Sequence, residues 1–235
     1  MLTLEVGTLK VASAFPDPPF ELGTTEAPAG IDVELMRADC RERQLDLQLI
    51  RYAGDDFNGI FEGLDAGRYD AVISGTTITP ERSKVALFSK PYLEFNQGVA
   101  VDRDRTPNVA TVADLRGLTA GIQSGNTSDI VARELVSNQT LAAIRYYPYA
   151  GIDSALQDLA AGRIGCVIKL VPVISWLVRA YPSLRVALQV PTHEQIGIAY
   201  ARDRSRLREA VDTTIEGLRA SGEFSSLVAR WFPGV

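Results

Sequence analysis

The sequence predicts an α/β protein made of two similar lobes in tandem. Short apolar runs alternate with amphipathic segments along all 235 residues, which is typical of strand–helix–strand units and a largely parallel sheet. One such unit occurs twice, because LDAGRYDAVI at 64–73 is echoed by LAAGRIGCVI at 159–168. Each copy contains a helix end, a Gly-Arg turn and a strand, and this self-similarity indicates a repeated architecture.

Hydrophobic spacing places the elements of the first lobe in order. The predicted elements are strands at 9–14, 46–52 and 71–74 and helices at 31–43 and 57–64. Asp55 or Asp56 is a suitable cap for the second helix, and Gly67 is a suitable end.

The second lobe and the C-terminal segment follow the same rules. The predicted elements are strands at 118–122 and 166–168, a helix at 129–136, and two final helices divided at Ser221-Gly222. Extended runs at 98–101 and 186–190 are the candidate crossings between lobes and would form a hinge. Lobe 1 is therefore expected to contain 1–98 and 191–235, and lobe 2 to contain 102–187.

Composition excludes several classes of function. A net charge of −5 makes a nucleic-acid partner unexpected. Two cysteines and one histidine are too few for a disulfide scaffold or most metal sites, so we expect no cofactor. No apolar run is long enough to span a membrane. Cys40 and Cys166 are expected to be packed thiols in different lobes.

Ligands of open α/β sheets bind beyond the carboxyl ends of the strands. Four loops occupy such positions, two in each lobe, and would face one another across a cleft: 15–20, 74–82, 123–128 and 169–172.

The 74–82 loop carries the clearest chemistry. Thr79 and Pro80 predict a helix start, which favours an anion. Arg82 in that first turn opposes the helix dipole, at a cost of about 0.3–1 kcal/mol, unless a carboxylate ligand reverses the sign. Pairing with a nearby acid, or a place along the surface, is an equally good account of Arg82. Ser74 opens the same loop.

The other loops offer further candidates with equally plausible structural roles. Gln123 and Asn126 belong to a turn that either closes on the same anion or is simply capped. Phe20 and Phe57 either wall a pocket or belong to the core. Asp17 either meets a cationic group or lies in a solvated turn.

Lys169 ends an apolar strand and must reach water, a partner or a ligand. Enzyme signatures are thin, with no Gly-x-Ser-x-Gly, His-Glu-x-x-His or dinucleotide fingerprint, so we expect no catalysis.

The motifs together resemble a known family, the extracytoplasmic solute-binding proteins of ABC importers, in the polar amino-acid-binding group. The resemblance covers nearly the whole chain, and its most specific part is the pair TITPER at 77–82 and FSKPY at 88–92. The other matching segments are 19–21, 30–34, 56–60, 70–76, 114–117, 125–127 and 231–232.

The resemblance implies a two-lobed periplasmic-binding-protein fold of type II and a role for individual residues. Arg82 matches the arginine that grips the ligand α-carboxylate, and Thr77 and Thr127 match the residues that complete that site. Gly75 matches a carbonyl acceptor for the α-amine, and Phe57 matches an aromatic that packs on the ligand.

One position departs from the family. Leu170 stands where the family usually places the aspartate that holds the α-ammonium. A buried ammonium without a carboxylate partner is costly. Either another acid, such as Asp17 or Glu194, takes over this role, or the ligand lacks a free α-amine and Lys169 meets a second anionic group.

The expected function is capture of a small carboxylate, an amino acid or a derivative, by lobe closure and delivery to an ABC transporter permease. We expect a monomer in the periplasm or otherwise outside the cytoplasm. Residues 1–10 lack the basic start and apolar core of a signal peptide, which fits either a cytoplasmic protein or a removed signal peptide, and the expected fold favours removal. The alternatives are a cyclohexadienyl dehydratase-like enzyme, with Glu194, Asp17 or His193 as general acid, and the sensing domain of a receptor.

Overall fold

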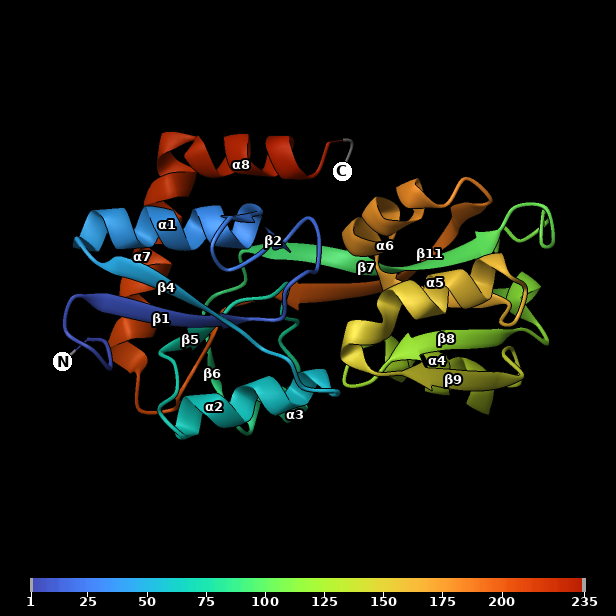
Figure 1. The fold of residues 1–235 in the computed structure, drawn as a ribbon, viewed down its shortest axis with the longest axis horizontal. Helices are drawn as coiled ribbons and strands as arrows, with labels where there is room; N and C mark the ends of the chain where they lie inside the picture. Colours follow the sequence, from blue (N-terminus) through green and yellow to red (C-terminus); the bar gives the residue numbers. More distant parts are fainter. Residues whose placement is uncertain (1, 234–235) are drawn as a thin grey trace. The chain divides into compact units, whose positions relative to one another are not determined.

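The computed structural model describes residues 2–233, which divide into two compact units. Within the described residues, unit 1 contains 2–53, 58–94 and 195–233, and unit 2 contains 54–57 and 95–194. Each unit has its own five-stranded sheet with helices packed on it (Figure 1). The α/β class predicted from the sequence is therefore confirmed.

The sheet of unit 1 has the strand order β4-β1-β5-β12-β6. Its strands are β1 (Thr8–Ser13), β4 (Asp46–Arg51), β5 (Ala71–Val72), β6 (Leu87–Phe88) and β12 (Ala199–Tyr200), and a separate hairpin joins β2 (Leu22–Gly23) to β3 (Pro28–Ala29). Strand β1 runs parallel to β4 and β5, whereas β12 is antiparallel to β5 and β6.

The helices of unit 1 are mostly those expected. They are α1 (Ile31–Arg43), α2 (Glu62–Asp65), α3 (Pro80–Ser83), α7 (Ser205–Ser221) and α8 (Glu223–Trp231). Helices α1, α7 and α8 contact one another, and Trp231 Nε1 donates to Glu34 Oε1 at 2.9 Å. The predicted division at Ser221-Gly222 is confirmed, with Gly222 in the left-handed region at φ 83°.

Unit 2 repeats the plan of unit 1, with the order β11-β7-β10-β8-β9. Its strands are β7 (Leu93–Asp102), β8 (Thr119–Gln123), β9 (Ala143–Tyr147), β10 (Cys166–Leu170) and β11 (Leu184–Ile196). Its helices are α4 (Ser128–Ser137), α5 (Ile152–Ala160) and α6 (Val171–Leu177), with 3₁₀ turns η2 (Val112–Leu115), η3 (Tyr149–Gly151) and η4 (Val178–Ala180). The parallel trio β9-β8-β10 corresponds to β4-β1-β5, so the predicted internal repeat is confirmed.

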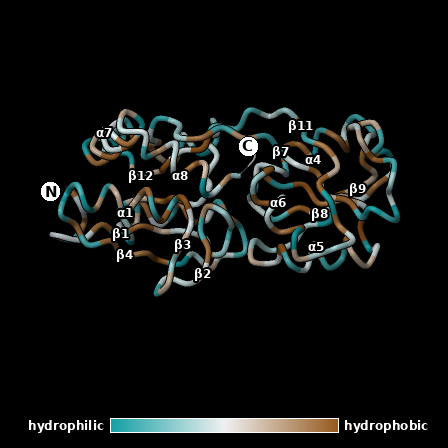
Figure 2. Tube along the Cα trace, turned by 90° about the horizontal axis from the view of Figure 1, so that it is seen from above, coloured by the Kyte–Doolittle hydropathy of each residue, from teal (hydrophilic) through white to brown (hydrophobic). Residues whose placement is uncertain are grey.

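Alternate residues of the central strands supply two cores on the two faces of the unit 2 sheet. Val99, Ile122 and Ile168 pack with α4 on one face, and Ala100 and Val167 pack with α5 and α6 on the other. Hydrophobic stretches run along β1 and β8, while the outer loops are hydrophilic (Figure 2). Burial on both faces explains why the central strand β10 is buried along its whole length, whereas the edge strand β9 is largely exposed.

The chain passes between the units inside long strands. One passage falls between Glu94 and Phe95 in β7, and the return falls between Glu194 and Gln195 in β11. The runs at 98–101 and 186–190 lie within these same two strands. The short segment 54–57 also groups with unit 2.

The predicted helix at 57–64 is wrong in form. A 3₁₀ turn, η1 (Phe57–Phe61), is followed by the single turn of α2. Backbone groups at the start of this segment bond to distant parts of the chain. Phe57 N donates to Ser124 O at 3.2 Å, and Asp55 O accepts from Tyr149 N at 2.7 Å. The α-helical turn α2 begins only after Phe61, so neither of the two predicted aspartates lies at its start.

A buried carboxyl group joins α1 to the loop after β5. Asp32 is fully buried and accepts hydrogen bonds from Gly75 N at 2.8 Å and from the Tyr92 hydroxyl at 2.7 Å. The pKa of Asp32 is raised to about 7, chiefly because burial disfavours the charged form; the two donors oppose this rise, and the charge of Asp17 adds a little to it. Asp32 thereby fixes the position of the loop that contains Ser74 and Gly75.

We expect the free energy of unfolding of Asp32→Asn to depend less on pH, between about pH 4 and 7, than that of the wild-type protein. The native carboxyl, with a pKa of about 7, holds a proton that the unfolded chain has released above about pH 4. Its contribution to the free energy of unfolding therefore falls as pH rises from about 4 to 7, by up to about 1.4 kcal/mol per pH unit.

Urea unfolding of both proteins at several pH values measures this difference, with exposed Asp65→Asn as the control. If the free energies of unfolding of the wild type and of Asp32→Asn change with pH in parallel across this range, the raised pKa of Asp32 is contradicted.

Candidate functional site

Arg82 is buried in unit 1, beyond the end of β5. Its side chain donates from Nε to Asn58 Oδ1 at 3.1 Å and from Nη1 to Thr77 O at 2.9 Å, and the guanidinium lies 5.5 Å from the centroid of the Phe61 ring. A place along the surface is thereby excluded. These contacts hold the guanidinium plane in one orientation.

The helix start predicted at this loop is confirmed. The Thr79 side chain accepts from Arg82 N at 3.1 Å, and Pro80 is the first helical residue. Helix α3 has only four residues, so its dipole is small. Anion binding by this loop stays a prediction, and the Arg82 guanidinium is its stronger candidate donor.

The Ser74-Gly75 turn has little conformational choice. Gly75 has φ +51°, and a Cβ atom there would lie 2.7 Å from a ring carbon of Phe20, so only glycine fits. The Ser74 hydroxyl donates to Glu21 Oε1 and accepts from Ala14 N at 3.1 Å. Because a hydroxyl has one proton to donate, Ser74 can offer a ligand only an acceptor.

The aromatic loop 15–20 is packed into unit 1. Phe20 is fully buried and meets Phe232 edge-on, with ring centroids 5.6 Å apart. Asp17 is also buried, and its backbone N–H donates to Glu21 O at 2.9 Å. The Phe20 ring therefore packs against the Gly75 turn. A direct contact of Phe20 or Asp17 with a ligand stays a prediction.

In unit 2, a carboxylate lies beside Thr127 on the sheet face that α4 covers. Glu194 accepts from the Thr127 hydroxyl at 2.6 Å and from Gln97 Nε2 at 2.7 Å. Leu170 is the register partner of Gln97 across the antiparallel β7–β10 pair, and such partners point to the same face. Glu194 therefore stands at the face and edge where the family resemblance implies an aspartate at 170.

The opposite face of the same edge carries a cation. Lys169 is 3% exposed, and its Nζ donates to Gln123 Oε1 at 2.7 Å and lies 5.5 Å from the centroid of the Tyr149 ring. Asn126 Nδ2 donates to the same Gln123 oxygen at 3.2 Å. Phe57, grouped with unit 2, packs against Tyr149 with centroids 5.1 Å apart. Unit 2 thus brings together Gln123, Asn126, Lys169 and Phe57 from the predicted set.

Two residues of this site have roles that sequence reasoning missed. The sequence did not suggest Gln97 as a site residue. In the structure its Oε1 is buried and has no hydrogen-bond partner among the described residues. Asp32 was part of a recognised motif but had no assigned role. An antiparallel register and a turn contact join these residues to the site, and neither can be derived from local spacing.

The described residues contain neither a metal-binding cluster nor a membrane-spanning helix. Within 2–233 no group of three or more His, Cys, Asp or Glu side chains could hold a metal ion, and no helix is long and apolar enough to cross a membrane. Cys40 and Cys166 are free and buried in different units, and burial raises the pKa of both thiols to about 12. The prediction of packed thiols is confirmed.

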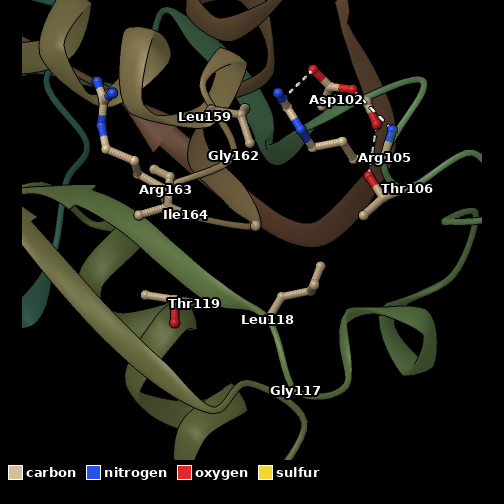
Figure 3. Close-up of a pocket in the computed structure, with 11 residues that line it drawn as sticks. Asp102, Arg105, Thr106, Gly117, Leu118, Thr119, Leu159, Gly162, Arg163 and Ile164 are labelled. Carbon is tan, nitrogen blue, oxygen red and sulfur yellow. Dashed lines mark hydrogen bonds and ion pairs between the residues drawn. The ribbon is translucent and has the colours of Figure 1, made fainter.

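A pocket of about 320 Å³ opens in unit 2 at the amino ends of β8 and β10, away from Gln123 and Lys169. Figure 3 shows Arg105 beside Asp102 at its rim. Arg105 Nη1 bonds Asp102 Oδ2 at 3.1 Å and Ala160 O at 2.6 Å, and Arg163 pairs with Asp158. The guanidinium groups of Arg105 and Arg163, which line this pocket, are therefore bound to acceptors of the protein itself.

Comparison with known proteins places the chain in a family. Residues 9–234 match the model of bacterial extracellular solute-binding proteins, family 3. The ABC transporter arginine-binding protein 1 of Escherichia coli (strain K12) is 32% identical over 92% of this chain and 87% of the relative.

Two solved structures are also similar. The arginine-bound substrate-binding protein AbpA of Streptococcus pneumoniae Canada MDR_19A has a TM-score of 0.82 and 31% identity, covering 96% of this chain and 94% of that one. An ancestral amino-acid-binding protein, AncCDT-1, described as a precursor of cyclohexadienyl dehydratase, has a TM-score of 0.85 and 27% identity, covering 96% and 95%. The chain has the two-lobed periplasmic-binding-protein fold and belongs to the bacterial extracellular solute-binding proteins of family 3.

Proposed function

We propose that this protein captures an α-amino acid outside the cytoplasm and delivers it to the membrane permease of an ABC importer. The observation that carries the proposal is the buried, oriented guanidinium of Arg82 in a chain of this family. A planar guanidinium binds a carboxylate through two parallel hydrogen bonds. Thr77 and Thr127 complete the carboxylate site, and relatives named as arginine- and histidine-binding proteins support an amino-acid ligand.

The α-ammonium is proposed to bind in unit 2 and at the Gly75 carbonyl. Glu194 supplies the negative charge that Leu170 lacks, and the buried Gln97 Oε1 supplies an acceptor that has no partner among the described residues. A buried acceptor without a partner costs about 1–3 kcal/mol, which an ammonium donor would recover. These two groups support a ligand with a free α-amine, in spite of the departure at position 170.

Capture is proposed to work by closure of the lobes about a hinge, with the protein acting as a monomer. The hinge would lie near 98–101 and 186–190, between a lobe of 1–98 plus 191–235 and a lobe of 102–187. Both runs belong to long strands that also contain the passages between the units. Paired strands permit a bend at a few residues without loss of the sheets on either side.

Arg82→Ala is expected to weaken amino-acid binding by about 2–5 kcal/mol, because a desolvated carboxylate loses its charged partner. Isothermal titration against a panel of amino acids and small organic acids measures the effect. Lys84→Ala is the matched control, since Lys84 is exposed two residues away and carries the same charge. Equal affinities of Arg82→Ala and wild type would refute the carboxylate role, and a wild-type protein that binds no member of the panel would refute the function.

Glu194→Gln is expected to weaken the binding of α-amino acids at least about tenfold, because it removes the charge opposite the ammonium. Binding of the corresponding acids without the amine, such as glutarate for glutamate, should change little, and each pair provides its own control. Thermal unfolding of the variant checks that loss of the bonds to Gln97 and Thr127 leaves it folded. A similar loss for both members of each pair would argue against an ammonium site.

An enzyme on the same fold is the second candidate, favoured by the likeness to a precursor of cyclohexadienyl dehydratase. We expect no turnover, because Glu194 is engaged by Thr127 and Gln97 and is assigned here to the ligand ammonium. Incubation with prephenate and with arogenate, followed by product detection, tests this expectation. Formation of phenylpyruvate or phenylalanine would overturn the non-catalytic assignment.

The sensing domain of a receptor is the remaining alternative, and a transmembrane helix encoded in a longer gene would favour it.

A further inference from the structure

Strand β11 departs from the extended conformation at one residue, immediately before Glu194. His193 has a φ of 49°, in the left-handed region that is uncommon for a residue other than glycine. The structure describes the whole of β11, and no other residue of this strand has a positive φ. A conformation of this kind persists only where the surrounding structure holds it, and such conformations cluster at functional sites.

The side chain of Asn96, on the neighbouring strand β7, holds this departure, which we call the 192–193 kink. Asn96 Oδ1 accepts hydrogen bonds from Thr192 N at 3.1 Å and from His193 N at 3.2 Å. Successive N–H groups of an extended strand point to opposite sides, whereas around a left-handed residue they converge on one acceptor. Because both partners are donors, the oxygen of the amide must face them.

The next residue of β7 holds the residue of β11 that follows the kink. Gln97 N donates to the Thr192 hydroxyl at 3.2 Å, and Gln97 Nε2 donates to Glu194 Oε1 at 2.7 Å. Asn96 and Gln97 thus restrain three consecutive residues of β11, two through their backbone and one through its carboxylate. Glu194 is only 9% exposed, so in a close-packed environment its side chain cannot simply rotate to compensate for a displaced backbone.

We propose that Asn96 is a positioning residue for recognition of the α-ammonium, because it holds the 192–193 kink that places the Glu194 carboxylate. This inference rests on the proposed function, in which Glu194 binds the ligand ammonium, and it adds a residue that acts through the backbone. Hydrogen bonds weaken steeply when donor and acceptor are misaligned. A carboxylate held in place before the ligand arrives also loses less conformational entropy on binding.

A positioning role and a merely structural role predict different results. If Asn96 only stabilised the sheet, its loss would affect all ligands alike. If it places Glu194, its loss affects ligands that carry an α-amine more than ligands that lack one. The quantity to measure is therefore the amine preference, defined as the affinity for an amino acid divided by the affinity for the same acid without its α-amine.

The test is isothermal titration of the wild-type protein and Asn96→Leu, a variant of similar volume that has no acceptor for the two N–H groups. The probes are amino acids that bind wild type, each with its amine-free counterpart: 5-guanidinopentanoate for arginine, glutaramate for glutamine and glutarate for glutamate. We expect Asn96→Leu to bind the amino acid at least about fivefold more weakly and the counterpart less than about twofold more weakly.

Two control variants should retain the wild-type amine preference. Asn96→Asp keeps an acceptor oxygen for both N–H groups. Gln189→Ala removes only the outer partner of Asn96, whose Nδ2 lies 3.4 Å from the Oε1 of the exposed Gln189 side chain. A loss of amine preference in either control contradicts the role of the Asn96 oxygen.

A pair of variants at His193 tests the kink without changing Asn96. Glycine adopts a positive φ without steric cost, whereas β-branched valine strongly disfavours it. Both His193→Gly and His193→Val remove the imidazole, so a difference between them reports the backbone conformation. We expect His193→Gly to show the larger amine preference, by at least about threefold. If Asn96→Leu does not fold, this pair decides the test.

The inference is overturned if Asn96→Leu weakens both members of a ligand pair equally or weakens neither, or if the two His193 variants have the same amine preference. In those outcomes the proposed function still stands, because Glu194→Gln tests the ammonium site independently. An amine preference near one in wild type would remove the ammonium site together with this inference. Absence of binding by every amino acid and organic acid would remove the proposed function as well.

Discussion

The site depends on the burial of one guanidinium group. Arg82 is 6% exposed, and a buried charge destabilises a fold unless hydrogen bonds and an opposite charge compensate for it. Among its acceptors are the Thr77 carbonyl and the Asn58 side chain. These bonds fix the plane of the guanidinium, and a guanidinium held in one plane suits the two oxygens of a carboxylate. The structure that surrounds Arg82 therefore functions as a support that holds a cation in a chosen direction.

The support extends outward through buried polar contacts in unit 1. Asp32 on α1 holds the Gly75 backbone, and the Tyr92 hydroxyl holds Asp32. Phe20 lies so close to Gly75 that a side chain there is impossible. Helix, turn and aromatic loop thus restrain the same short segment, whose carbonyl is the proposed acceptor for the ligand amine. Rigidity of this kind lowers the conformational entropy lost on binding.

Much of the fold could be predicted from the sequence because its signals are local. The helix at 31–43, the cap formed by Thr79 and Pro80, and the division at Ser221-Gly222 each depend on residues within one or two turns. The helix expected at 57–64 is instead a 3₁₀ turn followed by a single α-helical turn. Periodicity describes which face is apolar, and it does not record where a backbone N–H finds its acceptor.

The candidate site shows the same division between local and tertiary information. Arg82 and Lys169 could be selected because each follows a strand in a repeated unit. The pairing of Glu194 with Thr127 could not be predicted, because β11 returns to the sheet edge from a distant part of the sequence. The role of Gln97 depends on its register opposite Leu170, which no spacing rule supplies.

The internal repeat also shows how one backbone plan supports different chemistry. Ser74 and Lys169 occupy corresponding positions in the repeat, Ser74 just after β5 and Lys169 near the end of β10. In unit 1 the hydroxyl of Ser74 bonds Glu21 and the Ala14 amide and so serves the turn. In unit 2 the ammonium of Lys169 brings a full charge to the equivalent edge, beside a neutral amide that orients it.

Charge placement, rather than backbone shape, therefore differentiates the two halves. In the proposed site, Glu194 on β11 supplies the charge that the family resemblance would place at position 170 on β10, at the same edge and face of the sheet. What such a site must conserve is the position of the charge in space, because a ligand responds to the field and not to the strand that produces it.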